Sequence, residues 1–167
     1  MSELTTQQQM VLEQQYRRYD VVESTGEHLD SKAATVLQAG AFVIALTGVV
    51  ALPDVVRSPQ PPVPVLIGIA VAFGLFLGMI LCAIWAWRPA GHKQAGAVTW
   101  EEAFDAYINE DSDGCFRQVL SDLLGATAAN MTRNERKARY VTAAVWLLAL
   151  QVASILALAV AAELLPL

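Results

Sequence analysis

The sequence predicts an all-α integral membrane protein, with three transmembrane helices and a cytoplasmic helical bundle. Hydrophobic residues make up 55% of its 167 residues and charged residues only 16%. Three apolar runs contain no Asp, Glu, Lys or Arg, namely 33–52, 65–87 and 141–162. A bilayer core of about 30 Å needs roughly 20 helical residues, so each run is long enough to cross it. Uncharged runs of this length favour membrane spans over helices buried in a soluble bundle.

The segment before the first span, residues 1–32, is polar and lacks a basic start, so we do not expect a cleaved signal peptide. We expect it to form a cytoplasmic helix with a weak apolar stripe. The stripe consists of Leu4, Val11, Leu12, Tyr16 and Tyr19. The connection 53–64 holds five of the seven prolines, and we expect an irregular, stiff hairpin there.

The segment between the second and third spans, 89–140, predicts two helices. Thr99 and Glu102 form a capping box that opens a short helix through about Ile108, and the acidic stretch 109–114 breaks it. We expect the second helix to run from Cys115 to Ala162, directly into the third span, over about 70 Å at 1.5 Å per residue. Its cytoplasmic part carries an apolar stripe of Phe116, Val119, Leu120, Leu123, Leu124, Ala128 and Met131.

The basic residues predict the orientation in the membrane. Of 11 Lys and Arg, three precede the first span, seven lie between the second and third, and only Arg57 lies in the 53–64 connection. Lys and Arg collect on the cytoplasmic side, so the N-terminus and residues 89–140 are expected inside and the C-terminus outside. The aromatic residues expected at the cytoplasmic interface are Trp85, Trp87, Tyr140 and Trp146.

No motif for catalysis, metal or cofactor binding stands out, so we expect neither an enzyme nor a cofactor. Asn109, Asp111, Asp113 and Gly114 match the start of a calcium-binding loop, but its twelfth position is Leu120 instead of Glu. An acidic turn between helices is the favoured interpretation. The spacing of His28, His92 and Cys115 does not suggest a metal site, and Cys82 and Cys115 do not suggest a disulfide.

A few polar and small residues inside the spans are candidates for helix packing or for contacts between copies. Gln151 lies near the middle of its span and should face another helix; packing is favoured over a pore lining. Gln38 is the other polar candidate. Gly74 and Gly78 form a GxxxG pattern, and alanines recur every four residues from 149 to 161. Such small residues allow close helix approach, and we expect a homo-oligomer.

Charged residues form a collar where the first and third spans begin. We define the charged collar as Asp30, Lys32, Arg133, Arg136, Lys137 and Arg139. These residues would either contact lipid headgroups or bind the phosphate of a nucleotide. In the second case, Lys32, Arg136 and Arg139 would bind phosphate, and Asp30 would hold one cation in place when the ligand is absent.

Two stretches of the sequence resemble a known family. "HLDSKAATVLQAGAF", residues 28–42, is similar to the start of the first span in the Pycsar membrane effectors. "LSDLLGATAANMTRNERKARYVTAAVWLL", residues 120–148, resembles the helix that leads into their last span. The resemblance extends over roughly 27–87 and 115–150. Only Ala33 and the charged collar can be carried over residue by residue.

The resemblance implies a function in antiviral defence. In that family, a cyclase makes a cyclic pyrimidine nucleotide after phage infection, and the membrane effector then impairs the inner membrane, which leads to abortive infection. We therefore expect a multi-pass inner-membrane protein that responds to a nucleotide from a partner cyclase and does not bind duplex nucleic acid. The alternatives are a constitutive membrane scaffold or accessory subunit, and a small ion channel.

Overall fold

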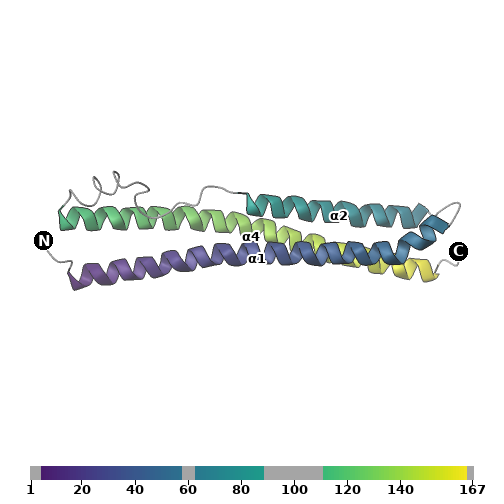
Figure 1. The fold of residues 1–167 in the computed structure, drawn as a ribbon, viewed down its shortest axis with the longest axis horizontal. Helices are drawn as coiled ribbons and strands as arrows, with labels where there is room; N and C mark the ends of the chain where they lie inside the picture. The colour runs from purple at the N-terminus through teal and green to yellow at the C-terminus, as the bar shows by residue number, and fades with distance from the viewer. Residues whose placement is uncertain (1–4, 58–62, 89–110, 165–167) are drawn as a thin grey trace. The chain divides into compact units, whose positions relative to one another are not determined.

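Three helices make up the described part of the chain in the computed structural model, which covers residues 5–57, 63–88 and 111–164. They are α1 (Thr6–Arg57), α2 (Val63–Trp87) and α4 (Ser112–Leu164) (Figure 1). Each contains a stretch long and apolar enough to cross a membrane. The predicted all-α class with three spans is therefore confirmed. The capping box at Thr99 and Glu102 lies outside the described residues.

The helices contribute to two compact units, which we describe separately. The polar unit contains 1–28 and 89–136, and the span unit contains 29–88 and 137–167. Helices α1 and α4 each supply one part to both units, whereas α2 belongs to the span unit alone. The prediction that the helix after the acidic stretch continues into the third span is confirmed, since α4 is 53 residues long.

Side-chain caps explain where α1 and α4 begin. Thr5 and Gln8 form a capping box: the Gln8 amide donates to Thr5 Oγ1 at 3.3 Å, and the Thr5 amide donates to Gln8 Oε1 at 2.8 Å. Asp111 caps α4, because its Oδ1 accepts from the Gly114 amide at 2.7 Å. Helix α4 therefore begins at Ser112, three residues before the predicted Cys115, and Asp113 and Gly114, which were expected in the turn between helices, lie inside it.

The 53–64 connection is more helical than the sequence suggested. Helix α1 continues through Pro53 to Arg57, and α2 begins at Val63, so the expectation of irregular structure across the whole connection is wrong. Proline lacks an amide hydrogen, but Pro53 loses only one helical hydrogen bond, and membrane helices tolerate this. Pro64 lies in the first turn of α2, where the amide hydrogen has no partner within the helix.

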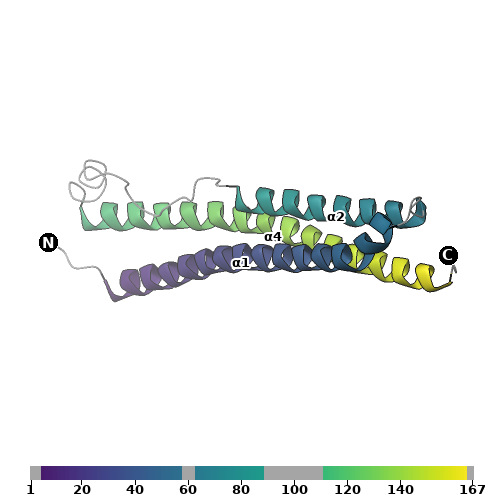
Figure 2. The ribbon, with the colours of Figure 1, turned by 45° about the vertical axis from the view of Figure 1, so that its right-hand side comes forward.

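The span unit is a three-helix bundle in which α1, α2 and α4 run side by side (Figures 1 and 2). Two clusters hold it together. The first consists of Ala33, Ala86 and Val141, and the second of Val36, Met79 and Ala144. Buried positions on α4 recur at alternating intervals of three and four residues, at Lys137, Val141, Ala144 and Gln151 with Leu148 half-buried between them. This is the spacing of a coiled-coil seam.

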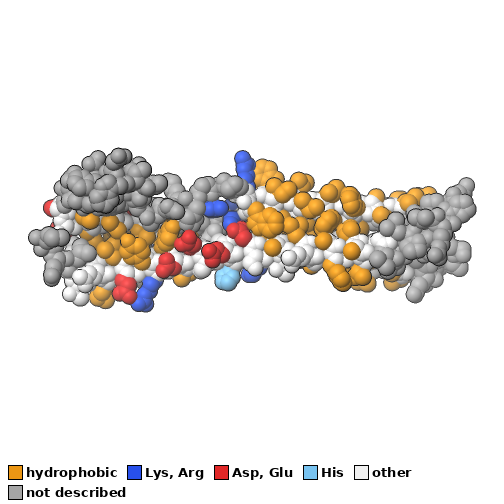
Figure 3. Space-filling view, in the orientation of Figure 1, with side chains coloured by type: hydrophobic (Ala, Val, Ile, Leu, Met, Phe, Trp, Pro, Cys, Tyr) orange, Lys and Arg blue, Asp and Glu red, His pale blue; other side chains and the backbone are white. Residues whose placement is uncertain are grey.

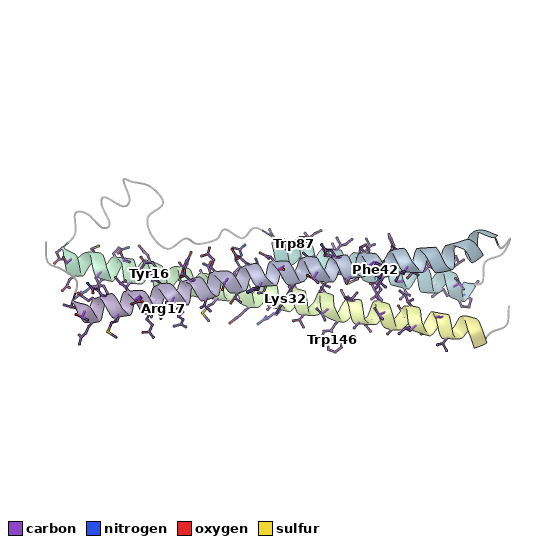
Figure 4. The ribbon with its side chains drawn as sticks, turned by 60° about the horizontal axis from the view of Figure 1, so that its bottom comes forward. Tyr16, Arg17, Lys32, Phe42, Trp87 and Trp146 are labelled. Atoms are coloured by element: carbon purple, nitrogen blue, oxygen red, sulfur yellow. The ribbon has the colours of Figure 1, made fainter. Side chains whose placement is uncertain are left out.

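The outer surface of the span unit is apolar. Only 11%, 11% and 17% of the most apolar windows of the three helices are buried. Hydrophobic side chains cover much of the visible face of α2 in Figure 3, and Trp146 points away from the bundle in Figure 4. Water would oppose so much exposed apolar surface, whereas lipid does not, so the chain is a multi-pass membrane protein.

The polar unit pairs the first part of α1 with the first part of α4. Gln8 Nε2 donates to Asp113 Oδ1 at 2.9 Å, and Asn134 Nδ2 donates to the Val22 carbonyl oxygen at 2.6 Å. On α1, the side facing inward is half-buried at every third or fourth residue. It consists of Leu12, Gln15, Tyr19, Val22 and Gly26.

This register differs from the predicted stripes. Val11 and Tyr16 are exposed, so the predicted stripe on α1 is wrong for these two residues. On α4, Leu123 is buried as predicted, but Leu124 and Met131 are exposed. The seam instead includes polar side chains, because Thr127 and Asn130 are buried. A search for apolar residues overlooks such a seam.

Candidate functional site

Asp30 and Lys137, two members of the charged collar, form an ion pair between α1 and α4 in the span unit. Lys137 Nζ donates to both carboxylate oxygens of Asp30, each at 2.7 Å. The Lys137 side chain is only 8% exposed, whereas that of Asp30 is 42% exposed. The ammonium group is therefore buried, and its counter-ion faces solvent.

The same Asp30 also links α1 to α2. Its backbone carbonyl oxygen accepts a hydrogen bond from Trp87 Nε1 at 3.3 Å. A carbonyl oxygen has two lone pairs, so it can accept this bond in addition to a helical one. Asp30 therefore contacts α4 through its side chain and α2 through its backbone. The cluster of Ala33, Ala86 and Val141 lies about one helical turn farther along the bundle.

Aromatic side chains surround this end of the span unit. The rings of Trp85 and Tyr140 stack with their centroids 6.2 Å apart and their planes at 25°. The Arg88 guanidinium lies over the Trp85 ring, 5.3 Å from its centroid. Figure 4 shows Trp87 at the end of α2 and Lys32 on α1. Half-exposed aromatic rings with neighbouring cations are typical of a membrane interface, as the sequence suggested for these residues.

The remaining cations of the charged collar are placed differently from Lys137. Lys32 and Arg139 belong to the span unit, and both are exposed. Arg133 and Arg136 belong to the polar unit; Arg136 is exposed, and Arg133 is half-buried. The Nε atom of Arg133 is buried and has no hydrogen-bond partner within the described residues. Asp30 thus holds Lys137, which was not one of the three cations expected to bind phosphate.

The two glutamines predicted for packing have different environments. Gln151 is 0% exposed and faces α2, where its Nε2 donates to the Ala72 carbonyl oxygen over a long 3.5 Å. Its Oε1 has no partner in the described part of the chain. The expectation that Gln151 faces another helix is confirmed, although its amide is only half satisfied. Gln38 is exposed on α1.

The two glycines of the GxxxG pattern also differ. A Cβ on Gly78 would lie 3.3 Å from Leu147 Cδ1, so Gly78 packs against α4 within the chain. Gly74 is exposed, and a Cβ there would meet no atom within 4 Å. Among the glycines that the structure describes, Gly40 has the least space, since a Cβ there would lie 2.6 Å from Met79 Cε. Gly40 was not among the residues predicted for packing, although it lies on the same side of α1 as the buried Ala33 and Val36.

These contacts favour binding and conformational roles. Among the described residues, no three His, Cys, Asp or Glu side chains lie close enough to hold a metal ion. Lys137, in the span unit, is a buried cation, and its partner Asp30 can be reached from solvent. Anions with several acceptor oxygens, such as phosphates, make strong hydrogen bonds to an ammonium group.

Comparison with known proteins identifies the family. No curated protein and no solved structure matches the sequence. The model of the Pycsar effector protein domain matches residues 16–164. This match includes α1 from Tyr16 onward, the whole of α2 and all of α4. Since it spans most of the 167 residues, the chain belongs to the Pycsar effector family of antiphage defence.

Proposed function

We propose that this protein is the membrane effector of a nucleotide-signalled defence system. A partner cyclase makes a cyclic pyrimidine nucleotide after phage infection, the effector responds to it, and the inner membrane loses its integrity. The infected cell then dies before phage are released. The effector acts without catalysis of its own and without a cofactor.

The observation that carries this proposal is the extent of the family match. The matched residues, 16–164, include much of the polar unit as well as the three spans. A scaffold or accessory subunit that needed only an anchor would not require the polar unit to follow the same pattern. The family match therefore supports a polar unit that takes part in effector function, together with the spans.

The positive-inside rule supports a polar unit in the cytoplasm, where the nucleotide is made. Arg17, Arg18 and Arg117 lie in this unit and are exposed, whereas the outer connection holds only Arg57. On this basis the N-terminus is cytoplasmic and the C-terminus lies outside the inner membrane.

The apolar surface of the span unit supports an effector made of several copies. Three helices that pack directly on one another cannot enclose a water-filled path, because their inner positions are filled by side chains such as Met79. The exposed small residues Gly74, Ala149 and Ala153 would allow a second copy to approach closely in lipid. Damage to the membrane would then require a homo-oligomer.

Membrane potential after infection tests this proposal. Cells that carry the effector and its cognate cyclase should depolarise after phage infection, as reported by a potential-sensitive dye. Cells with an inactive cyclase should keep their potential. Lys32→Ala and Arg139→Ala should reduce depolarisation if the exposed cations of the span unit help to attract the anionic signal, whereas Arg17→Ala, in the polar unit, serves as the control. Continued polarisation of wild-type cells during cell death would contradict the proposal, and harmless expression under all conditions would support a constitutive scaffold.

A further inference from the structure

The Asp30–Lys137 pair has an asymmetry that bears on how the effector is switched. Lys137 is buried on the seam of α4, where its side chain is 8% exposed, whereas the Asp30 side chain is 42% exposed. Removing one partner of a buried pair is strongly destabilising, because it leaves an uncompensated charge. Lys137 therefore requires an anion at this position for as long as the helices remain packed around it.

Release of the two partners has unequal consequences. The Asp30 carboxylate already contacts water, so it can become fully hydrated at little cost. Lys137 cannot do the same without separation of the helices that bury it. Any event that separates the pair while the bundle persists must therefore supply a second anion to Lys137.

We propose that Lys137 is a phosphate-binding residue of the span unit, and that an anion bearing a phosphate group activates the protein by replacing Asp30 as its counter-ion. This inference rests on the proposed function, because it names the group in this chain that the signal contacts. The phosphate oxygens offer the ammonium group the same charge-assisted hydrogen bonds as a carboxylate. The exchange therefore leaves no buried charge unpaired.

The exchange would change the packing of the bundle. In the resting state, Asp30 links α1 to α4 through its side chain and α1 to α2 through the Trp87 indole. Replacement by phosphate breaks the link to α4 and leaves the link to α2. Helix α4 could then move relative to the other two, next to the cluster of Ala33, Ala86 and Val141. The extent of the shift is limited by the difference in the ligand's affinity for the two arrangements.

A buried reporter position next to the pair allows a direct test. Ala86 is 2% exposed, so a cysteine placed there by Ala86→Cys, with Cys82→Ser and Cys115→Ser, should react slowly with a maleimide. The full chain is studied in bilayer discs of phosphatidylcholine. Cyclic CMP or cyclic UMP should raise the alkylation rate about tenfold, which corresponds to about 1.4 kcal/mol. Cytidine and uridine, which lack phosphate, should leave it unchanged.

Variants of the pair separate anion exchange from simple stabilisation. In the Asp30→Asn variant, the cysteine introduced at Ala86 should react fast with the maleimide even without nucleotide, because Lys137 has lost its counter-ion. In the double variant, Asp30→Asn with Lys137→Met, the same cysteine should react slowly with or without nucleotide, because neither charge remains. Asp30→Glu keeps the negative charge, and it is the variant to study if Asp30→Asn does not fold. The matched control is the exposed pair of Glu13 and Arg17, 2.6 Å apart, where Glu13→Gln with Arg17→Met should leave the wild-type response intact.

Further conditions of the alkylation experiment identify the source of the phosphate. Discs containing phosphatidylglycerol, without nucleotide, test whether a lipid headgroup supplies the anion, and inorganic phosphate tests a minimal one. The inference is overturned if none of the phosphate compounds accelerates alkylation of the wild-type background, or if the double variant responds as the wild type does. Depolarisation of infected cells by the double variant would also overturn it while leaving the proposed function intact. Conversely, nucleotide-driven alkylation in discs without depolarisation in cells would contradict only the proposed function.

Discussion

Replacement of Gly40 by alanine tests the tight contact between α1 and the Met79 side chain of α2. A Cβ at this position would lie 2.6 Å from Met79 Cε, 3.2 Å from Met79 Sδ and 3.3 Å from Phe76 Cδ2. Carbon atoms in good contact are about 3.5–4.0 Å apart, so Met79 must move. Met79 is 0% exposed and is packed between α1 and α4, which leaves it little room.

Two opposing terms set the size of the effect. Overpacking of a well-packed core costs about 1–3 kcal/mol. In a helix interior, alanine is more favourable than glycine by about 1 kcal/mol in the free energy of helix formation, which offsets part of this cost. Gly74→Ala is the matched control, because its Cβ would meet nothing within 4 Å and only the favourable term remains. We therefore expect Gly40→Ala to be less stable than Gly74→Ala by about 1–3 kcal/mol.

The free energy of unfolding in detergent micelles, from denaturant titration followed by tryptophan fluorescence, measures this difference. Met79→Ala should remove the clash, so that Gly40→Ala is no longer destabilising in that background, and a double-mutant cycle gives the coupling energy. Equal stability of Gly40→Ala and Gly74→Ala, with no coupling to Met79, would refute the close approach of α1 and α2 at this point.

Three further predictions concern the span centre, the cap of α4 and the topology. Gln151→Leu should raise the free energy of unfolding by about 1 kcal/mol, because it removes a half-satisfied buried amide; exposed Gln38→Leu is the control, and a loss of stability would show that the amide is well bonded. Asp111→Ala should cost about 1 kcal/mol through loss of the cap and should speed hydrogen exchange at the Gly114 amide, whereas Asp111→Asn should change little; equal exchange in both variants would argue against the cap. A reporter fused after Leu167 should lie outside the cell membrane and one inserted near Asp111 should be cytoplasmic; signals from the same side would contradict a three-span topology.

Elements that depend on strong local contrast could be predicted from the sequence alone. Long uncharged runs between charged segments identified three spans, since a bilayer tolerates few charges over about 20 residues. The absence of a breaking residue after Cys115 predicted the continuous helix α4. The collar residues were identified as a group, because charge next to an apolar run stands out in any sequence.

Which helix faces meet could be learned only from the packing of the helices. Inside the spans nearly every residue is apolar, so the sequence shows no difference between positions that face lipid and positions that face another helix. Gly40 and Gly74 consequently looked alike, although one packs closely against Met79 and the other is open. In the polar unit, Thr127 and Asn130 occupy the seam while Leu124 is exposed, so apolar periodicity located Leu123 correctly but missed the polar part of the seam.

The pairing in the charged collar also required three dimensions. Asp30 and Lys137 are 107 positions apart, and the sequence offered Asp30 several cations of equal charge. Lys137 is selected because it lies on the seam of α4, where burial leaves its ammonium group dependent on one carboxylate, whereas Lys32 and Arg139 remain exposed. Charge can be counted along a chain, but the environment that makes one charge depend on another is set by the packing of the helices.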